Sequence, residues 1–118
     1  MPDPVISDNL EVIDQALKMI ALRFKGIESA ETFIQSEEGT TLLDAISMRL
    51  QVIGEKVKRI EKHAPGIFQR YNIDSSVIIR FRDFISHNYE NVDHEIIFNT
   101  CKNDLPDLHR KIVLMMRA

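Results

Sequence analysis

The sequence predicts an all-α protein, a four- to five-helix up-down antiparallel bundle whose last helix is kinked near Pro106. Three observations predict it. Apolar residues recur at helical spacing along most of the chain, Gly26 and Pro65-Gly66 separate periodic segments, and no stretch shows a sustained strand alternation bounded by hairpin turns. At 118 residues the chain fits a single domain, 1–118, large enough to bury a core.

The first two helices are predicted from their apolar spacing and their capping residues. Asp8 and Glu11 have the form of a capping box, which predicts a first helix from about Asp8 to Phe24. A short amphipathic piece, 29–35, follows. A second and longer helix is expected to start near Thr40 or Thr41, because turn-forming and capping residues precede it, and to end at Pro65-Gly66.

The second half of the chain predicts two further helices, the last of them interrupted. Asp74 or Ser75 can cap a third helix that stops near Asn88, and Asp93 can cap a fourth. Within the fourth, Pro106 has no backbone N–H to donate, so it forces a kink or a fresh start.

Composition and charge exclude several classes of protein. The net charge of −3 argues against an extended basic surface for duplex nucleic acid, so any nucleic-acid site must be local. One basic stretch, Lys56–His63, is present, although the ordinary interpretation is a solvated helix face. Cys101 is the single cysteine and is expected to be a small buried hydrophobe. With no signal-peptide pattern and no apolar run of spanning length, we expect a cytoplasmic protein without a membrane partner.

Most familiar catalytic signatures are missing. The sequence has no glycine-rich phosphate loop, no nucleophile elbow and no Cys/His pairing. The four histidines fall in separate segments, and none has a second histidine three or four residues away, so we expect no metal site and no cofactor.

The third predicted helix carries the residues that favour chemistry. On a helical wheel its apolar residues occupy one arc, and the opposite arc holds Arg80, Arg82, Asp83, Ser86 and His87. Arg82 and His87 are separated by about 140° on that wheel, so a single protomer would not bring them together closely. From spacing alone, the solvated face of an amphipathic helix is the simpler interpretation.

The same segment resembles the HEPN superfamily signature, an arginine, a polar residue, three more residues and a histidine. Residues 82–87, Arg-Asp-Phe-Ile-Ser-His, fit it, and with Tyr89 the segment is similar to the R-x4-H-x-Y form of HepT-like toxins. The likeness also covers 50–55, 91–93 and 104–108, so it spans about two thirds of the chain.

The resemblance implies a metal-independent endoribonuclease toxin, paired with a minimal nucleotidyltransferase as antitoxin. His87 would be the general acid/base for attack by a ribose 2′-hydroxyl, and Arg82 would hold the phosphate. Asp83, Asn88 and Arg80 would support the pair, and Tyr89 would accept adenylate from the antitoxin. Members of the family typically form a homodimer that lines one cleft with both motifs, which would supply arginine and histidine from two chains.

Two alternatives stay open. The chain could be a non-catalytic helical partner or substrate-binding subunit of a nucleotidyltransferase, which the acidic net charge favours. It could also be an unrelated four-helix dimerisation domain, which would make the likeness over four segments accidental. The presence of both Arg82 and His87, with the basic stretch, favours the nuclease.

Overall fold

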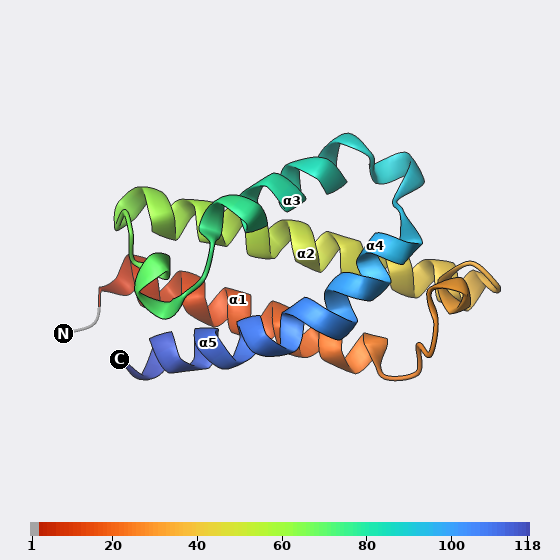
Figure 1. Cartoon of the computed structure of the whole chain (residues 1–118), viewed down its shortest axis with the longest axis horizontal. Helices are drawn as coiled ribbons and strands as arrows, with labels where there is room; N and C mark the ends of the chain where they lie inside the picture. The colour runs from red at the N-terminus through yellow and green to blue at the C-terminus, as the bar shows by residue number, and fades with distance from the viewer. Residues whose placement is uncertain (1–2) are drawn as a thin grey trace.

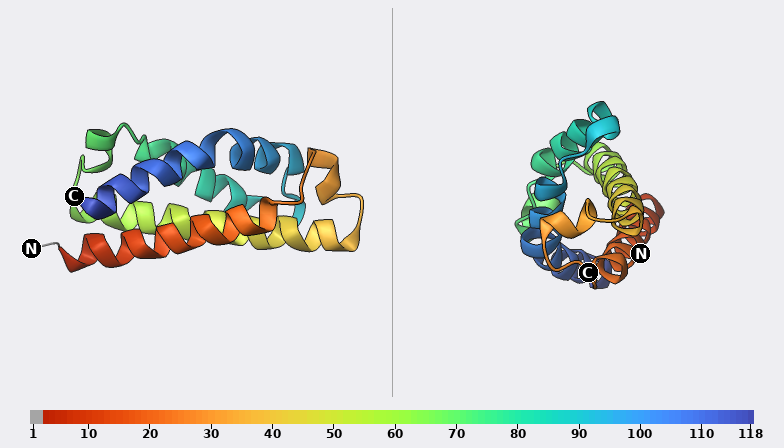
Figure 2. Two further views of the ribbon diagram at one scale, coloured as in Figure 1. Left: turned by 90° about the horizontal axis from the view of Figure 1, so that it is seen from below. Right: turned by 90° about the vertical axis from the view of Figure 1, so that its right-hand side faces the viewer.

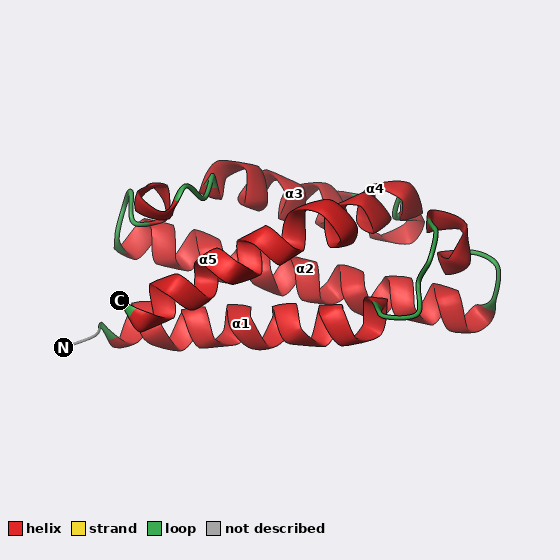
Figure 3. Ribbon diagram, turned by 60° about the horizontal axis from the view of Figure 1, so that its bottom comes forward, coloured by secondary structure: helices red, strands yellow, loops and turns green. Residues whose placement is uncertain are grey.

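The computed structural model describes residues 3–118, except for the side chain of Tyr89, and in this part of the chain all regular structure is helical (Figures 1 and 3). The order of elements is α1 (Pro4–Phe24), η1 (Ala30–Phe33), α2 (Glu37–His63), η2 (Phe68–Tyr71), α3 (Ser75–His87), η3 (Tyr89–Asn91), α4 (His94–Asn99), η4 (Thr100–Asp104) and α5 (Leu105–Arg117).

The long elements run up and down in turn. In Figure 1, α1 and α3 run in one direction, and α2 and the consecutive α4 and α5 run in the other. The end-on view of Figure 2 shows these helices around a common centre, and residues 3 and 118 lie at the same end of the bundle. The predicted up-down antiparallel bundle is therefore confirmed. Among residues 3–118, no helix combines the length and apolar character needed to cross a bilayer.

Helix α1 begins four residues earlier than the sequence analysis predicted. Asp3 is its N-cap, its carboxylate accepts a hydrogen bond of 2.9 Å from the backbone N–H of Val5, and Pro4 stands at the first helical position. A carboxylate that accepts a free N–H and a proline with a preset φ both favour a helix start. The capping box assigned to Asp8 and Glu11 was wrong, because both residues lie inside the helix.

Helix α2 also begins earlier than predicted, at Glu37 rather than Thr40 or Thr41. Ser36 is the N-cap, and its hydroxyl accepts a hydrogen bond of 3.0 Å from Gly39 N–H. Glu37 and Glu38 fill the first turn, where negative charge is favoured by the helix dipole. The helix ends at His63, before Pro65-Gly66 as expected, and its 27 residues make it about twice the average length.

The core lies between α1, α2 and the C-terminal helices. Helix α1 packs on both α2 and α5, and α4 packs against η1. The largest side chains that are fully buried come from all of these elements: Ile13, Ile20, Phe33, Ile46, Ile53, Val57, Ile60, Phe68, Ile85, Ile97 and Ile112. Burial of this apolar surface is the dominant stabilising term of the fold.

The predicted interruption near Pro106 is a short π-helical segment. Residues Thr100–Asp104 form η4 between α4 and α5, and Pro106 lies in the first turn of α5, where its missing N–H costs no helical bond. Cys101 in this segment is buried, as expected, and burial raises the pKa of its thiol to about 12. The thiol is therefore a packing group and not a nucleophile.

Candidate active site on α3

Helix α3 carries the predicted motif, and its ends are those expected from the sequence. The Asp74 carboxylate accepts hydrogen bonds from the backbone N–H groups of Ser76 and Val77, at 3.1 and 3.3 Å. At the other end, the N–H of Asn88 donates to the Ile85 carbonyl. The helix is thus capped by the residues predicted to cap it, and the motif residues 82–87 fill its last turns.

Helix α3 packs antiparallel on α2, and three contacts fix the register. Ser75 Oγ donates to the Glu61 carboxylate at 2.8 Å, and Ser86 Oγ donates to Gln51 Oε1 at 2.9 Å. Between them, Arg82 lies against Gly54. The motif is therefore held at both ends of the helix by polar contacts with one partner helix.

The contact between Gly54 and Arg82 is unusually close. A Cβ atom built on Gly54 would lie 2.6 Å from Cγ of Arg82 and would also overlap its Cβ. Real Cβ atoms do not approach other carbons so closely, so only glycine allows the two helices to meet at this distance. Gly54 thereby leaves the space on α2 that the Cβ and Cγ atoms of Arg82 occupy.

This packing corrects the helical-wheel interpretation of α3 as having a solvated polar arc. Arg82 and Ser86 face α2, and the Arg82 side chain is only 18% exposed. Two apolar residues of the helix, Val77 and Phe84, are instead 50% and 39% exposed. The helical wheel gave the wrong exposure because it does not describe the partner helix. On α2, Gly54 leaves room for the aliphatic part of Arg82, and Gln51 accepts a hydrogen bond from Ser86.

Asp83 contacts both principal residues of the motif. Its carboxylate Oδ1 lies 2.9 Å from Nε of Arg82, and its backbone carbonyl accepts a hydrogen bond of 2.7 Å from Nδ1 of His87. The contact with Arg82 is electrostatic, because the buried Nε–H of Arg82 makes no hydrogen bond within the described structure. One residue therefore connects the guanidinium and the imidazole.

The bond from His87 to the Asp83 carbonyl selects one tautomer of the ring. A carbonyl oxygen only accepts, so Nδ1 must carry the proton, and the neutral ring then has its lone pair on Nε2. The His87 residue is exposed at the end of α3. Its Nε2 atom can consequently take a proton from a bound molecule, which is what a general base must do.

The remaining predicted site residues are distributed around this turn. Asn88 is exposed, and its side-chain amide donates to the Phe84 carbonyl at 2.8 Å, so it closes the end of the helix. Arg80 is exposed two turns before His87 and lies near Asp74, whose carboxyl pKa is lowered first by its hydrogen bonds to Ser76 and Val77 and also by Arg80. The side chain of Tyr89 lies outside what the structure describes.

Arg82 and His87 make no hydrogen bond or ion pair with each other in the described part of the chain. The expectation that one protomer does not join them directly agrees with their surroundings, since Arg82 is seated against α2 and His87 projects from the end of α3. The connection that the structure shows between them runs through Asp83.

The basic stretch of α2 lies beside the same helix. Gly54 is level with Arg82, so the antiparallel register places Lys56 level with Arg80, and the exposed Lys58, Arg59 and Lys62 continue toward the start of α3. The basic stretch therefore begins level with Arg80, just before the motif, and runs toward the start of α3, away from His87.

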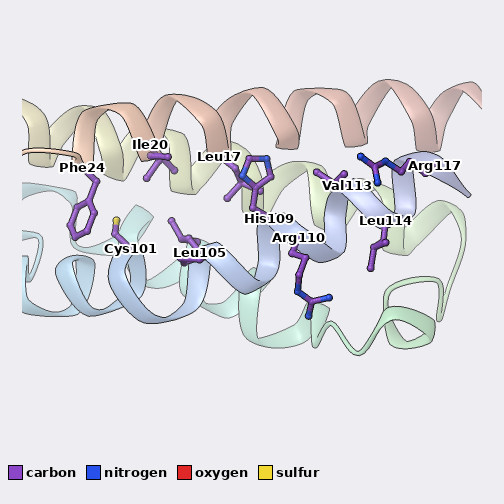
Figure 4. A pocket seen from close by; sticks show the side chains of 12 residues that line it. Leu17, Ile20, Phe24, Cys101, Leu105, His109, Arg110, Val113, Leu114 and Arg117 are labelled. Carbon is purple, nitrogen blue, oxygen red and sulfur yellow. The ribbon is translucent and has the colours of Figure 1, made fainter.

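A hollow lies between α1 and α5 and is lined by none of the motif residues. It encloses about 530 Å³ and is lined mainly by apolar side chains such as Leu17, Phe24 and Leu105, with His109 beside them (Figure 4). His109 is engaged in a contact of 2.7 Å with the buried Asp14. This arrangement is that of a structural contact between two helices.

Sequence reasoning named Arg82, Asp83 and His87 but assigned no structural role to Gly54, Gln51 or Ser86. A signal for Gly54 was present, because a single glycine within a strong helical pattern usually has a packing reason. Gln51 and Ser86 had no such signal, since polar residues in a helix are ordinarily solvated.

The chain is an all-α bundle, and its helix α3 carries an arginine, an aspartate and a histidine on adjacent turns. These features describe the class of protein to which comparisons with known proteins then give a name. The model of the family described as "Ribonuclease HepT-like" matches residues 9–115. The chain therefore belongs to the HepT-like ribonuclease family, which confirms the likeness to the HEPN superfamily expected from the motif.

A relative agrees with this assignment. The chain is 31% identical over 108 residues to "Putative RNase TTE0752" of Caldanaerobacter subterraneus subsp. tengcongensis, and the match covers 87% of each protein. No solved structure matches the chain. The family and this relative support an RNA-cleaving enzyme.

Proposed function

We propose that the chain is a metal-independent endoribonuclease toxin whose catalytic residues are Arg82 and His87. The observation that supports this best is the double contact of Asp83, which orients His87 through a backbone carbonyl and lies beside the Arg82 guanidinium. A base of fixed orientation and a phosphate-binding cation are the two groups that cleavage by a ribose hydroxyl requires.

The proposed reaction needs only groups of the protein and the RNA. Nε2 of His87 takes the proton of a 2′-hydroxyl, O2′ attacks the adjacent phosphorus, and the bond to the 5′-oxygen breaks. Protonated histidine returns a proton to that leaving oxygen. Arg82 stabilises the negative charge that grows on the phosphate oxygens. The products are a 2′,3′-cyclic phosphate and a 5′-hydroxyl.

A second copy of the chain would complete the site in this proposal. Val77 and Phe84 of α3 and Ile96 of α4 are exposed apolar residues, and Phe84 stacks on Phe81 with ring centroids 6.4 Å apart. Val77, Phe81 and Ile96 line one groove, and apolar residues grouped in this way are typical of surfaces that another protein covers. A two-fold dimer over α3 would bring the motif of one protomer toward that of the other.

The toxin role adds a partner enzyme. In this proposal the toxin acts on cytoplasmic RNA until a nucleotidyltransferase antitoxin transfers adenylate from ATP to the Tyr89 hydroxyl, two residues after His87, and releases pyrophosphate. The added phosphate would carry negative charge to the neighbourhood of Arg82 and compete with RNA for it. Intact-mass spectrometry after co-expression with a candidate nucleotidyltransferase antitoxin tests this step. A wild-type chain without added adenylate, or equal modification of Tyr89→Phe, would contradict it.

Cleavage itself is tested with purified protein and a single-stranded RNA in the presence of EDTA. We expect wild type to cleave and to leave cyclic phosphate ends, and His87→Ala to abolish cleavage without changing the helical circular-dichroism spectrum. His63→Ala is the matched control, because His63 is exposed on α2 and its imidazole is paired with Asp3, away from the motif. Cleavage by His87→Ala at the wild-type rate would refute the catalytic assignment.

Mixing two inactive variants, Arg82→Ala and His87→Ala, tests whether the arginine and the histidine of one site belong to one protomer or to two. If arginine and histidine come from different protomers, half of a randomly mixed population is heterodimeric and each heterodimer regains one of two sites. Activity should then return to about a quarter of the wild-type value. No recovery in a mixture shown to exchange subunits would place both residues of a site in one chain.

The acidic net charge favours a second candidate function, a non-catalytic helical subunit that binds a nucleotidyltransferase. In that case α3 would be an interface. The cleavage assay separates the two candidates, because this subunit would bind the enzyme and leave RNA intact.

A further inference from the structure

Three side chains with metal-ligating atoms meet at the junction of η1 and α4. Glu31 belongs to η1, and His94 and Glu95 are the first two residues of α4. One ligand atom of each residue lies within 4.8 Å of the others. From sequence spacing we expected no metal site, because no histidine has a second histidine three or four residues away. Glu31 and His94 are 63 positions apart, and only the fold brings them together.

The core holds the two segments that carry these residues. Phe33 of η1 is fully buried, and the rings of Phe33 and Phe98 of α4 both pack on Phe24, with centroids 6.3 and 5.4 Å away. The Asp93 carboxylate fixes the start of α4 by accepting hydrogen bonds from Glu95 and Ile96 N–H. The backbone positions of all three residues are thus determined by packing and capping.

The two carboxylates are close together without a cation to balance them. The ion pairs of residues 3–118 use Asp3, Asp14, Asp83 and Asp107, and none involves Glu31 or Glu95. Two like charges at this separation repel each other, and a divalent cation would convert the repulsion into attraction. A bound divalent cation would therefore favour this juxtaposition.

The donor set indicates the class of ion. Two carboxylate oxygens and one imidazole nitrogen suit Zn²⁺ and neighbouring first-row ions, whereas Mg²⁺ and Ca²⁺ favour oxygen ligands alone. Ligand atoms around tetrahedral zinc are about 3.3 Å apart, a separation that exposed glutamate side chains reach by rotating about their own bonds. Solvent can supply the fourth ligand, since both glutamates are exposed.

We propose that Glu31, His94 and Glu95 bind one divalent transition-metal ion, with zinc as the best fit, and that this ion fastens η1 to the start of α4. The site is separate from Arg82 and His87, so it does not depend on the proposed nuclease and supplies no catalytic group. It would stabilise the segment that follows the motif, because α4 begins directly after residues 88–93.

The test is calorimetric titration of untagged, metal-free protein with ZnCl₂, together with thermal unfolding. We expect one ion per chain, a higher Tm with zinc, and at least a tenfold loss of affinity in His94→Ala and in Glu31→Gln. His63→Ala is the control, because it removes an exposed histidine that also lies beside a carboxylate, and it should bind zinc as wild type does.

Two results would overturn the proposal. One is the absence of saturable zinc binding by the wild-type chain. The other is equal affinity in wild type, His94→Ala and Glu31→Gln, which would show that zinc binds elsewhere. Circular dichroism of each variant confirms that the exposed substitutions leave the helical fold intact.

Discussion

The side chain of Arg82 leaves α3 directly over the bare backbone of Gly54 on α2. No other residue type at position 54 leaves room for this contact, so the placement of the proposed phosphate-binding arginine depends on a residue of a different helix.

Gly54→Ala should reduce both stability and RNA cleavage. The new methyl group would lie 2.6 Å from Cγ of Arg82, so α3 must move away from α2 or the arginine must change its path. We expect the free energy of unfolding to fall by about 1–3 kcal/mol, measured by urea denaturation. Gly26→Ala is the control, because nothing lies within 4 Å of its added Cβ. Wild-type stability and activity in Gly54→Ala would disprove the packing argument.

Arg80→Ala should weaken RNA binding in a salt-dependent way. Arg80 is exposed near the motif and level with Lys56 in the antiparallel register, so its charge adds to that of the basic stretch. In a His87→Ala background, where RNA stays intact, the slope of log affinity against log salt should decrease by about 0.7, the value for one phosphate contact on a single strand. Arg110→Ala removes an arginine that is paired with Asp107 on α5 and should leave the slope unchanged.

Asp14 should make the fold sensitive to acid. Burial pushes the pKa of its carboxyl upward, but hydrogen bonds from His109 and Lys18 outweigh burial and hold the pKa below its ordinary value. A lowered pKa in the folded state stabilises the protein above the ordinary carboxyl pKa of about 4, and this contribution is lost as the pH falls through the folded-state value.

Asp14→Asn should therefore be less stable than wild type at pH 7, by about 1–3 kcal/mol in urea denaturation, and the difference should shrink below pH 4. Asp107→Asn is the comparison, because the exposed Asp107 also has a lowered carboxyl pKa, owing first to its hydrogen bonds with Arg110 and Lys111. Its loss should matter less in a solvated pair. A difference between Asp14→Asn and wild type that stays constant from pH 7 to pH 3 would contradict this account.

Cys101 should be unreactive in the folded protein. Burial raises its thiol pKa to about 12, so almost no thiolate exists at pH 8. Ellman's reagent should label the chain rapidly in denaturant and very slowly without it. Rapid labelling of native protein would mean that η4 opens readily.

Much of the fold was predictable because it depends on local patterns. The ends of α3 followed from Asp74 and Asn88, and the interruption before α5 followed from Pro106. The starts of α1 and α2 were misplaced because several residues in each stretch can cap a helix, and packing decides among them. Asp3 and Ser36 had the required side chains, but Asp8 and Thr40 had them too.

The candidate site was predictable in its residue types and not in its geometry. The motif named Arg82 and His87, whereas the packing of Arg82 on Gly54 depends on the contact between two helices. The bond from His87 to the Asp83 carbonyl is local to α3, but it depends on the rotamer of His87, which residue spacing does not specify. The helical wheel failed because it describes one helix and not the shape of its partner. The grouping of Glu31 with His94 likewise depends on contacts between distant segments.

Residues 3 and 118 lie at the same end of the bundle, and α3 runs away from that end (Figure 1). A fluorescent label or surface linker attached to either end would leave the His87 turn unobstructed. Single-molecule measurements of RNA encounters are thus practical without altering any residue discussed above.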